Sequence, residues 1–328
     1  MRESIRRTVW GFVLCQAITI HAAISGAAIN GPRAGAGSAH SLFIKPDGSL
    51  WAMGGNFSGQ IGDGTFNQTN TPEMIVPSNV VAVAAGSDFS FFVDSASNLW
   101  AMGDNGRGEL GLGGISGTAV PVKVATNVTG VAAGHDHTLF CKGDGSLWAM
   151  GNNINGALGD GGFASINVPE EILPNGVTTV AAGQGFSLFI KTDGSLWAVG
   201  NNSSGQLGDG NSGTKTNKAE EIVSNGVVAV AADFSHSMFL KSDGSLWGMG
   251  DNSVGELGDG TTNSTDVPEC IVSNGVMAIS VGQQFSVFVK TNGSLWSMGV
   301  NGYGQLGGGP TLGNNTPLYT NTPMEVVS

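Results

Sequence analysis

The chain has 328 residues, of which 54 are glycine, 12% are charged and 40% are hydrophobic. Its formal net charge of −12 argues against nucleic acid or an anionic membrane surface as a partner, because both repel an acidic protein. The glycines lack the every-third-residue rhythm of collagen, and the hydrophobic content is that of a globular chain rather than a disordered one.

The first 28 residues have the character of an export signal. Arg2, Arg6 and Arg7 precede an apolar stretch over residues 9–20, and small residues suited to signal cleavage follow it. The apolar stretch is shorter than the roughly 20 residues that span a bilayer. We therefore expect a signal peptide over residues 1–28, no membrane insertion, and a secreted, cell-surface or periplasmic protein. The alternative is an uncleaved N-terminal tail.

Residues 32–328 repeat with a period of about 49 residues. Six tryptophans mark the copies: Trp51, Trp100, Trp148, Trp197, Trp247 and Trp296. Leucine precedes every one of them, glycine stands three, eight, eleven and thirteen residues later, and asparagine five residues later. A fixed period built of short apolar runs and turn residues is typical of a repeat architecture.

Each copy contains four short runs with the character of β-strands. In the second copy these runs cover residues 80–86, 89–94, 98–103 and 121–124, and the fourth run recurs at 169–173 and 219–223. In the other five copies, Asp-Gly or Asn-Gly between the second and third runs predicts a tight hairpin, and the Asn-Gly before copies four to six is interpreted as another hairpin. The sequence therefore predicts an all-β chain whose four-stranded sheets form a β-propeller of six blades.

Strand order predicts how the loops are distributed. In an up-and-down sheet, successive connections alternate between the two ends of the strands. The two-residue links (such as 87–88 and 135–136) and the long GxNxxGxLGxG loops are therefore expected at one end, here called the long-loop face. The tight turns are expected at the other end.

Two blocks carry a family resemblance. HSLFIKPDGSLWAMGGNFSGQIGDGT (residues 40–65) and HSMFLKSDGSLWGMGDNSVGELGDGT (236–261) resemble repeats of the regulator of chromosome condensation family. WD repeats fit less well, because alanine, glycine or serine rather than aspartate follows each tryptophan. The resemblance implies a propeller that usually has seven blades. With six copies, the chain forms either a closed six-bladed ring or an incomplete seven-bladed one.

The sequence offers no pattern for catalysis, and we expect neither enzyme activity nor a cofactor or metal site. His135 has no predicted nucleophile beside it. The glycine-rich loops lack the helix and the lysine of a phosphate cradle. One aspartate per loop is too few for calcium; these are Asp63, Asp160, Asp209 and Asp259. One position of the repeat holds histidine in three copies and phenylalanine in the other three, which indicates a packed aromatic ring rather than a catalytic or metal-binding imidazole. The residues at this position are His40, Phe89, His137, Phe186, His236 and Phe285.

The six tryptophans are expected to form a structural core between the blades. Each shares a sheet face with the residue two positions later, which is methionine in five copies and Val199 in one. Cys141 and Cys270 occupy different columns of the repeat, so we expect two buried free thiols rather than a disulfide.

Recognition is expected on the long-loop face, where the copies differ from one another. The candidate binding residues are Phe57, Phe66, Asp88, Arg107, His135, Asp136, Ile154, Phe163, Phe234 and Tyr303. Exposed aromatic and arginine side chains are the usual anchors of protein interfaces. The sequence thus predicts a non-catalytic module that binds a protein or a surface glycan.

Other functions remain as alternatives. The first is a structural module or a fragment of a larger surface protein. The family resemblance adds guanine-nucleotide exchange on a small GTPase, light sensing and β-lactamase inhibition by a secreted bacterial member, for which this sequence shows no matching interface motif.

Overall fold

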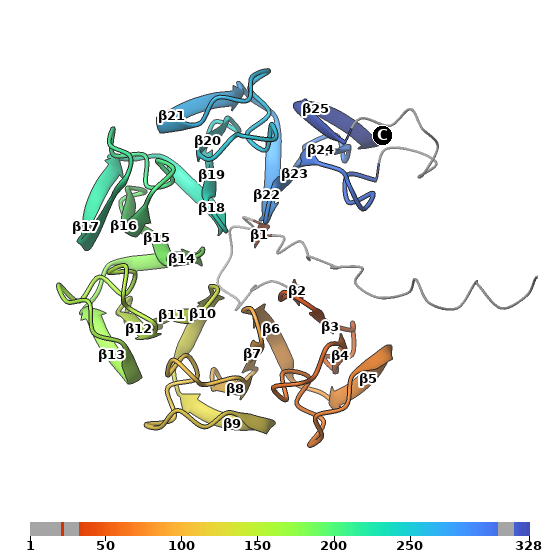
Figure 1. The fold of residues 1–328 in the computed structure, drawn as a ribbon. Helices are drawn as coiled ribbons and strands as arrows, with labels where there is room; N and C mark the ends of the chain where they lie inside the picture. The colour runs from red at the N-terminus through yellow and green to blue at the C-terminus, as the bar shows by residue number, and fades with distance from the viewer. Residues whose placement is uncertain (1–20, 23–32, 308–317) are drawn as a thin grey trace, which may run out of the picture.

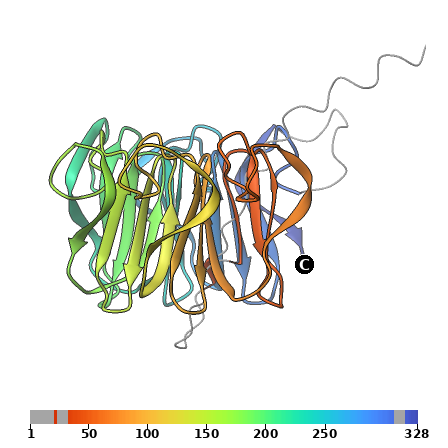
Figure 2. The ribbon, with the colours of Figure 1, turned by 90° about the horizontal axis from the view of Figure 1, so that it is seen from below.

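The computed structural model describes residues 21–22, 33–307 and 318–328, and within these ranges it contains strands, turns and loops but no helix. The six copies form six four-stranded antiparallel sheets that stand as blades around a central axis (Figures 1 and 2). The predicted all-β six-bladed propeller is confirmed. The described ranges hold no helix long and apolar enough to cross a membrane.

The blades follow the chain in order. Blade 1 comprises β2 (Ala34–Ala36), β3 (His40–Ile44), β4 (Leu50–Gly54) and β5 (Thr69–Val76). Blade 2 comprises β6 (Val80–Ala85), β7 (Phe89–Asp94), β8 (Leu99–Gly103) and β9 (Thr118–Ala125). Blade 3 comprises β10 (Val128–Ala133), β11 (His137–Lys142), β12 (Leu147–Gly151) and β13 (Ile166–Leu173). Blade 4 comprises β14 (Val177–Ala182), β15 (Phe186–Lys191), β16 (Leu196–Asn202) and β17 (Thr214–Val223). Blade 5 comprises β18 (Val227–Asp233), β19 (His236–Lys241), β20 (Leu246–Gly250) and β21 (Thr265–Val272). Blade 6 comprises β22 (Val276–Gly282), β23 (Phe285–Lys290), β24 (Leu295–Val300) and β25 (Tyr319–Val327).

Every blade has its first strand nearest the axis and its fourth strand outermost (Figure 1). One further strand, β1 (His21–Ala22), pairs antiparallel with the inner edge of β22. These two residues belong to the segment expected to be a signal peptide. The rest of that segment, residues 1–20 and 23–28, lies outside the described residues, so export stays a prediction.

The second and third strands of each blade place phenylalanine directly opposite tryptophan, as Phe92 and Trp100 illustrate. In all six copies the two rings are stacked, with centroids 5.9–6.5 Å apart. In five copies a lysine ammonium lies 3.4–4.5 Å from the centroid of the indole ring. The tryptophans are half-buried, and five of them pack against the core clusters between blades together with their phenylalanine partners.

The Asn-Gly pairs between copies form turns, but the predicted hairpins there are wrong. β13 and β14, for example, belong to different sheets, so the turn that joins them passes from the outer strand of one blade to the inner strand of the next. Gly176 takes a φ of +86°, which explains the glycine. The sequence signal for a turn is correct, but it does not specify which strand the following residues pair with.

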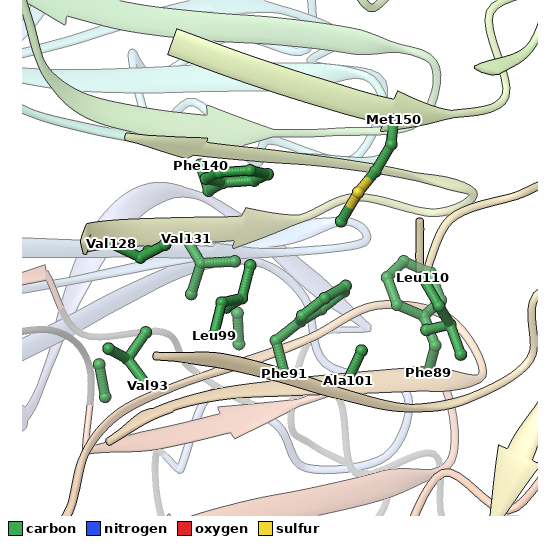
Figure 3. Packing of buried hydrophobic residues seen from close by; sticks show 12 residues of the cluster. Phe89, Phe91, Val93, Leu99, Ala101, Leu110, Val128, Val131, Phe140 and Met150 are labelled. Carbon is green, nitrogen blue, oxygen red and sulfur yellow. The ribbon is translucent and has the colours of Figure 1, made fainter. Parts of the chain in front are cut away.

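The hydrophobic core is divided among the junctions between blades. Figure 3 shows the junction of blades 2 and 3, where Phe91 and Leu99 of one sheet lie against Phe140 and Met150 of the other. All four side chains are at most 1% exposed. Because a single blade buries neither face alone, the packing of neighbouring blades is the main source of stability.

The two cysteines differ in environment. Cys141 is buried and free, as expected. Cys270 is free but exposed on β21, because the outer strand of each blade faces solvent; the prediction that it is buried was wrong.

Candidate functional site: the mouth of the central channel

The long loops and the two-residue links lie together, as predicted. The backbone N–H of Asp104, in a long loop, donates to the carbonyl of Asp88, in a link, at 2.9 Å. An asparagine holds each long loop in shape: Asn56 accepts a bond from the Ile61 N–H at 3.0 Å and donates to the Asp63 carboxylate at 3.1 Å. The same asparagine-to-aspartate bond uses Asp160, Asp209 and Asp259, so these carboxylates serve loop structure.

A pocket of about 160 Å³ opens at the centre of this face. The ends of all six inner strands line it, mostly with alanine and glycine, and the first residues of the links complete its rim. Small residues at the strand ends leave this space, and the links supply the side chains that give it chemical character. Those side chains include His135, Asp233, Phe234 and Gln283.

His135 and Asp136 form an ion pair at this mouth. Nδ1 of His135 lies 3.0 Å from Oδ1 of Asp136, and both side chains are partly exposed. The hydrogen bond to Asp136 raises the pKa of His135, and the same bond lowers the pKa of Asp136. The negative charges of Asp233 and Asp88 further raise the pKa of His135. The acidic neighbours of His135 therefore favour its protonated form more than water does.

Asp233 is the acid that sequence reasoning missed. It occupies the column where the other five copies have glycine, and its carboxylate accepts the backbone N–H of Phe234 at 2.7 Å. Burial raises the pKa of Asp233 to about 6, against the opposing attraction of His135. Comparison of the six copies shows that Asp233 replaces a glycine, but only the arrangement of the blades around the axis places Asp233 at the channel.

Two residues of the preceding blades lie close to the aspartates of the acidic rim. Gln60 donates its side-chain N–H to Asp88 at 3.0 Å, across the junction of blades 1 and 2. Glu109 occupies the same column one blade later, beneath Asp136, and is 1% exposed. Burial, together with the charges of Asp104 and Asp136, raises the pKa of Glu109 to about 7.

The structure brings together some of the predicted binding residues and separates others. Asp88, His135, Asp136 and Phe234 lie on the links around the channel mouth, and the charge of Arg107 reaches Asp136. The others lie singly in long loops of blades 1, 3 and 6 and are well exposed: Phe57, Phe66, Ile154, Phe163 and Tyr303. Phe163 is covered on one side by Lys215, whose ammonium lies 4.9 Å from the ring centroid.

The immediate partners of His135 can be stated for the residues that the structure describes. Within the described part of the chain, no hydroxyl or thiol hydrogen-bonds to the His135 ring, whose partner is the Asp136 carboxylate. The described residues also contain no cluster of three or more histidine, cysteine, aspartate or glutamate side chains arranged for a metal ion. The mouth offers charged groups, hydrogen-bonding groups and one aromatic ring.

Comparison with known proteins identifies the family. The model of the RCC1-like domain matches residues 29–328. The chain belongs to the RCC1-like domain family. A search of curated proteins found no significant match.

Solved structures of this family share the fold. The chain is similar to Prp20p from Saccharomyces cerevisiae, with a TM-score of 0.79 and 24% identity over 90% of this chain and 76% of that one. It is also similar to human WBSCR16, with a TM-score of 0.77 and 23% identity over 90% of this chain and 81% of that one. At these identities the similarity establishes a common RCC1-like fold, and the function must be argued from the site.

Proposed function

We propose that this RCC1-like propeller is a non-catalytic protein-binding module whose recognition site is the long-loop face, centred on the channel mouth. The observation that carries the proposal is where the six copies differ in sequence. The junction residues repeat from copy to copy, whereas the six links differ in every copy and five of them line one pocket. A site that recognises a partner needs side chains that differ around its rim.

The chemistry of the rim favours a basic group on the partner. Asp233 lines the pocket, Asp88 and Asp136 lie near enough to act on His135, and Phe234 offers an aromatic surface against which an alkyl stem or a guanidinium packs. A protruding lysine or arginine side chain of a partner protein combines these features. The net charge of −12 steers such a partner towards the chain.

Solved relatives make protein binding the natural class of function. Prp20p is described with its binding properties to Gsp1p and histones, and yeast RCC1 has been solved bound by Kap60. Guanine-nucleotide exchange is the second candidate, supported by the fold shared with Prp20p, but no residue of the channel mouth favours it over simple binding.

We also propose export, because the N-terminal segment has the pattern of a signal peptide.

Affinity capture with the exported chain as bait tests the proposal. The variants Phe57→Ser, Arg107→Ser, Phe234→Ser and Tyr303→Ser are expected to weaken capture of a partner, by about 2 kcal/mol for an anchor, with little change in thermal stability. Ser195→Ala is the matched control on the opposite face: Ser195 bonds Asp193 and Trp197, so its loss lowers stability and leaves capture intact.

Two outcomes would count against the proposal. A partner indifferent to all four changes shows that the binding face is misassigned. If no partner is captured under several conditions, the structural-module alternative becomes the better one. Export is tested separately by N-terminal sequencing, since protein recovered outside the cell is expected to lack its first 22 to 28 residues.

A further inference from the structure

A second pocket lies within the junction of blades 3 and 4. Its volume is about 170 Å³, and it is lined by Leu139, Leu147 and Leu158 of blade 3 and by Phe189 and Trp197 of blade 4. These residues belong to the hydrophobic cluster that joins the two blades. The pocket shares no lining residue with the channel mouth, so it is a separate cavity of the molecule.

Three residues of blade 4 that line this pocket depart from the repeat. Val199 stands where the other five copies have methionine, and Ala219 stands where they have proline. Lys218 stands where they have threonine or valine. The three residues come from two strands, β16 and β17, yet they meet at one cavity. Two of these departures remove side-chain volume, and the third adds a positive charge.

The smaller side chains account for the space. At the junction of blades 2 and 3, a Cβ placed on Gly111 would collide with the sulfur of Met150 and would lie 3.1 Å from the ring of Pro169. At the junction of blades 3 and 4, a Cβ placed on the corresponding Gly159 would lie 3.4 Å from Val199, its nearest neighbour. The methionine and the proline that fill the first junction are therefore the residues whose replacement leaves room in the second.

The size and the lining of the pocket suit one aromatic ring. An apolar cavity of about 150 Å³ in a protein core stays dry and binds benzene. Leu158 and Phe189 are at most 1% exposed. The Ser187 hydroxyl also lines the pocket, but it already donates to the Ala157 carbonyl at 2.7 Å and lies 2.9 Å from Nε2 of His137. The inner part of the pocket therefore favours an apolar group.

Two ammonium groups give the pocket a positive side. The ammonium of Lys191 lies 3.6 Å from the centroid of the Trp197 ring, and Lys218 is exposed on β17, the outer strand of blade 4 (Figure 1). Within the described ranges neither lysine forms an ion pair, and no carboxylate is among the residues that line the pocket. Cations without a counter-ion beside an apolar cavity complement a ligand that has one apolar end and one anionic end.

From these observations we infer that the junction of blades 3 and 4 is a binding site for a small apolar carboxylate with the bulk of one aromatic ring. The ring fills the space beside Val199 and Ala219, and the carboxylate lies towards Lys218 and Lys191. A neutral ring leaves both lysines without a counter-ion, and an aromatic amine adds a third positive charge. The site goes beyond the protein binding proposed for the long-loop face and does not depend on it.

Titration calorimetry of the intact chain with benzoate as the probe tests the site. We expect one benzoate to bind per chain. Benzyl alcohol and benzylamine carry the same ring with a neutral or a cationic group, and both are expected to bind about tenfold more weakly or worse.

Two single variants separate the apolar from the charged part of the site. Val199→Met restores the residue of the other copies, so it is expected to fill the cavity, to weaken benzoate binding about tenfold or more and to raise the thermal midpoint. Lys218→Thr is expected to weaken benzoate binding about tenfold and to leave the binding of benzyl alcohol unchanged.

The junction of blades 4 and 5 offers a matched control, because its walls carry the same residue types as the walls of the pocket. The corresponding residues are Leu188, Leu196, Leu207, Phe239 and Trp247. The combined variant Met249→Val, Val267→Lys and Pro268→Ala copies the three departures to this junction. It is expected to bind two benzoates per chain, and adding Val199→Met to it is expected to return the number to one.

Three results would overturn the inference. Benzoate binding that is unchanged in the Val199→Met variant places the carboxylate elsewhere on the chain. Benzylamine that binds as tightly as benzoate removes the role assigned to the lysines. No benzoate binding at millimolar concentration, together with a higher thermal midpoint for Val199→Met, shows that the pocket is a packing defect only. Because the two pockets share no lining residue, partner capture by the channel-mouth variants is an independent result.

Discussion

His40 of blade 1 and Ser90 of blade 2 form a hydrogen bond in which only one assignment of donor and acceptor is possible. Nε2 of His40 lies 2.8 Å from the Ser90 hydroxyl, which donates its own proton to the Gln60 carbonyl at 2.7 Å. The imidazole must therefore donate from Nε2 and keep an unprotonated Nδ1, for which no described atom is a partner. The same pair recurs as His137 with Ser187 and His236 with Ser286.

These three histidines make the fold sensitive to acid. Burial lowers the pKa of each to about 4, from an ordinary value of 6.5. The unfolded chain takes up protons below pH 6.5 and the folded chain does so only near pH 4, so the stability they provide is complete above pH 6.5 and lost as the pH falls to 4. Replacing all three by phenylalanine, the residue of the alternate copies, is expected to flatten the fall in free energy of unfolding across this window. The full shift corresponds to roughly 3 kcal/mol per histidine. An unchanged slope in urea titrations at several pH values would contradict this reading.

Glu109 is expected to give the stability of the fold the opposite dependence on pH. Burial raises its pKa to about 7 from 4.5, so the folded state retains a proton that the unfolded chain releases, and its contribution to stability is lost as the pH rises from 4.5 to 7. Glu109→Gln is expected to raise stability at pH 8 by on the order of 1–2 kcal/mol and to have little effect at pH 5. Gln60 shows that the amide fits this column: it accepts a backbone N–H at 2.9 Å and donates to the aspartate of the next blade. A gain of equal size at both pH values would show that ionisation of Glu109 is not its source.

The stacked aromatic pairs are expected to contribute unequally to stability. Phe189 is 1% exposed between blades, so Phe189→Ala is expected to cost about 3–5 kcal/mol. Trp197 is half-buried, so Trp197→Ala is expected to cost about 2 kcal/mol, because less of its apolar surface leaves water on folding. Denaturant midpoints measure both, with Trp51→Ala as the matched control that lacks a preceding blade. A larger loss for Trp197→Ala than for Phe189→Ala would contradict the burial order.

The cysteines give a test of the fold without mutation. Cys270 is exposed, whereas burial raises the pKa of the Cys141 thiol to about 12. A thiol reagent is expected to modify Cys270 in the native protein and Cys141 only after unfolding, as site mapping by mass spectrometry will show. Rapid modification of Cys141 in the native protein would mean that the junction of blades 3 and 4 opens readily.

The sequence predicted the strands well because their signals are local. The run at residues 89–94 became β7 with the same bounds, since alternation of side chains and a tight turn are properties of neighbouring residues. The Asn-Gly links show the limit of such signals. A turn that joins two sheets uses the same left-handed glycine as a turn within one sheet, so Gly176 alone does not distinguish them.

The candidate site was predicted only in part, because the sequence shows which residues are unusual but not which of them meet. His135 and Phe234 were found because they differ from their columns, and Asp233 carries that same signal in a column otherwise made of glycine. These residues meet at one pocket only because each blade is rotated about the axis relative to the blade before it. The angle of rotation is set by side-chain packing between neighbouring sheets. The residues in contact lie about 49 positions apart in the sequence, so the sequence of a single repeat does not reveal the angle.

The stacked tryptophans have an optical consequence. Five indoles lie against an inter-blade cluster in the same manner, so their ultraviolet emission describes the average state of the ring and not that of a chosen blade. Trp51 differs, because it belongs to blade 1 and no described cluster from a preceding blade covers it. With the other five and Trp10 replaced by phenylalanine, the emission of Trp51 alone becomes a spectroscopic probe of blade 1.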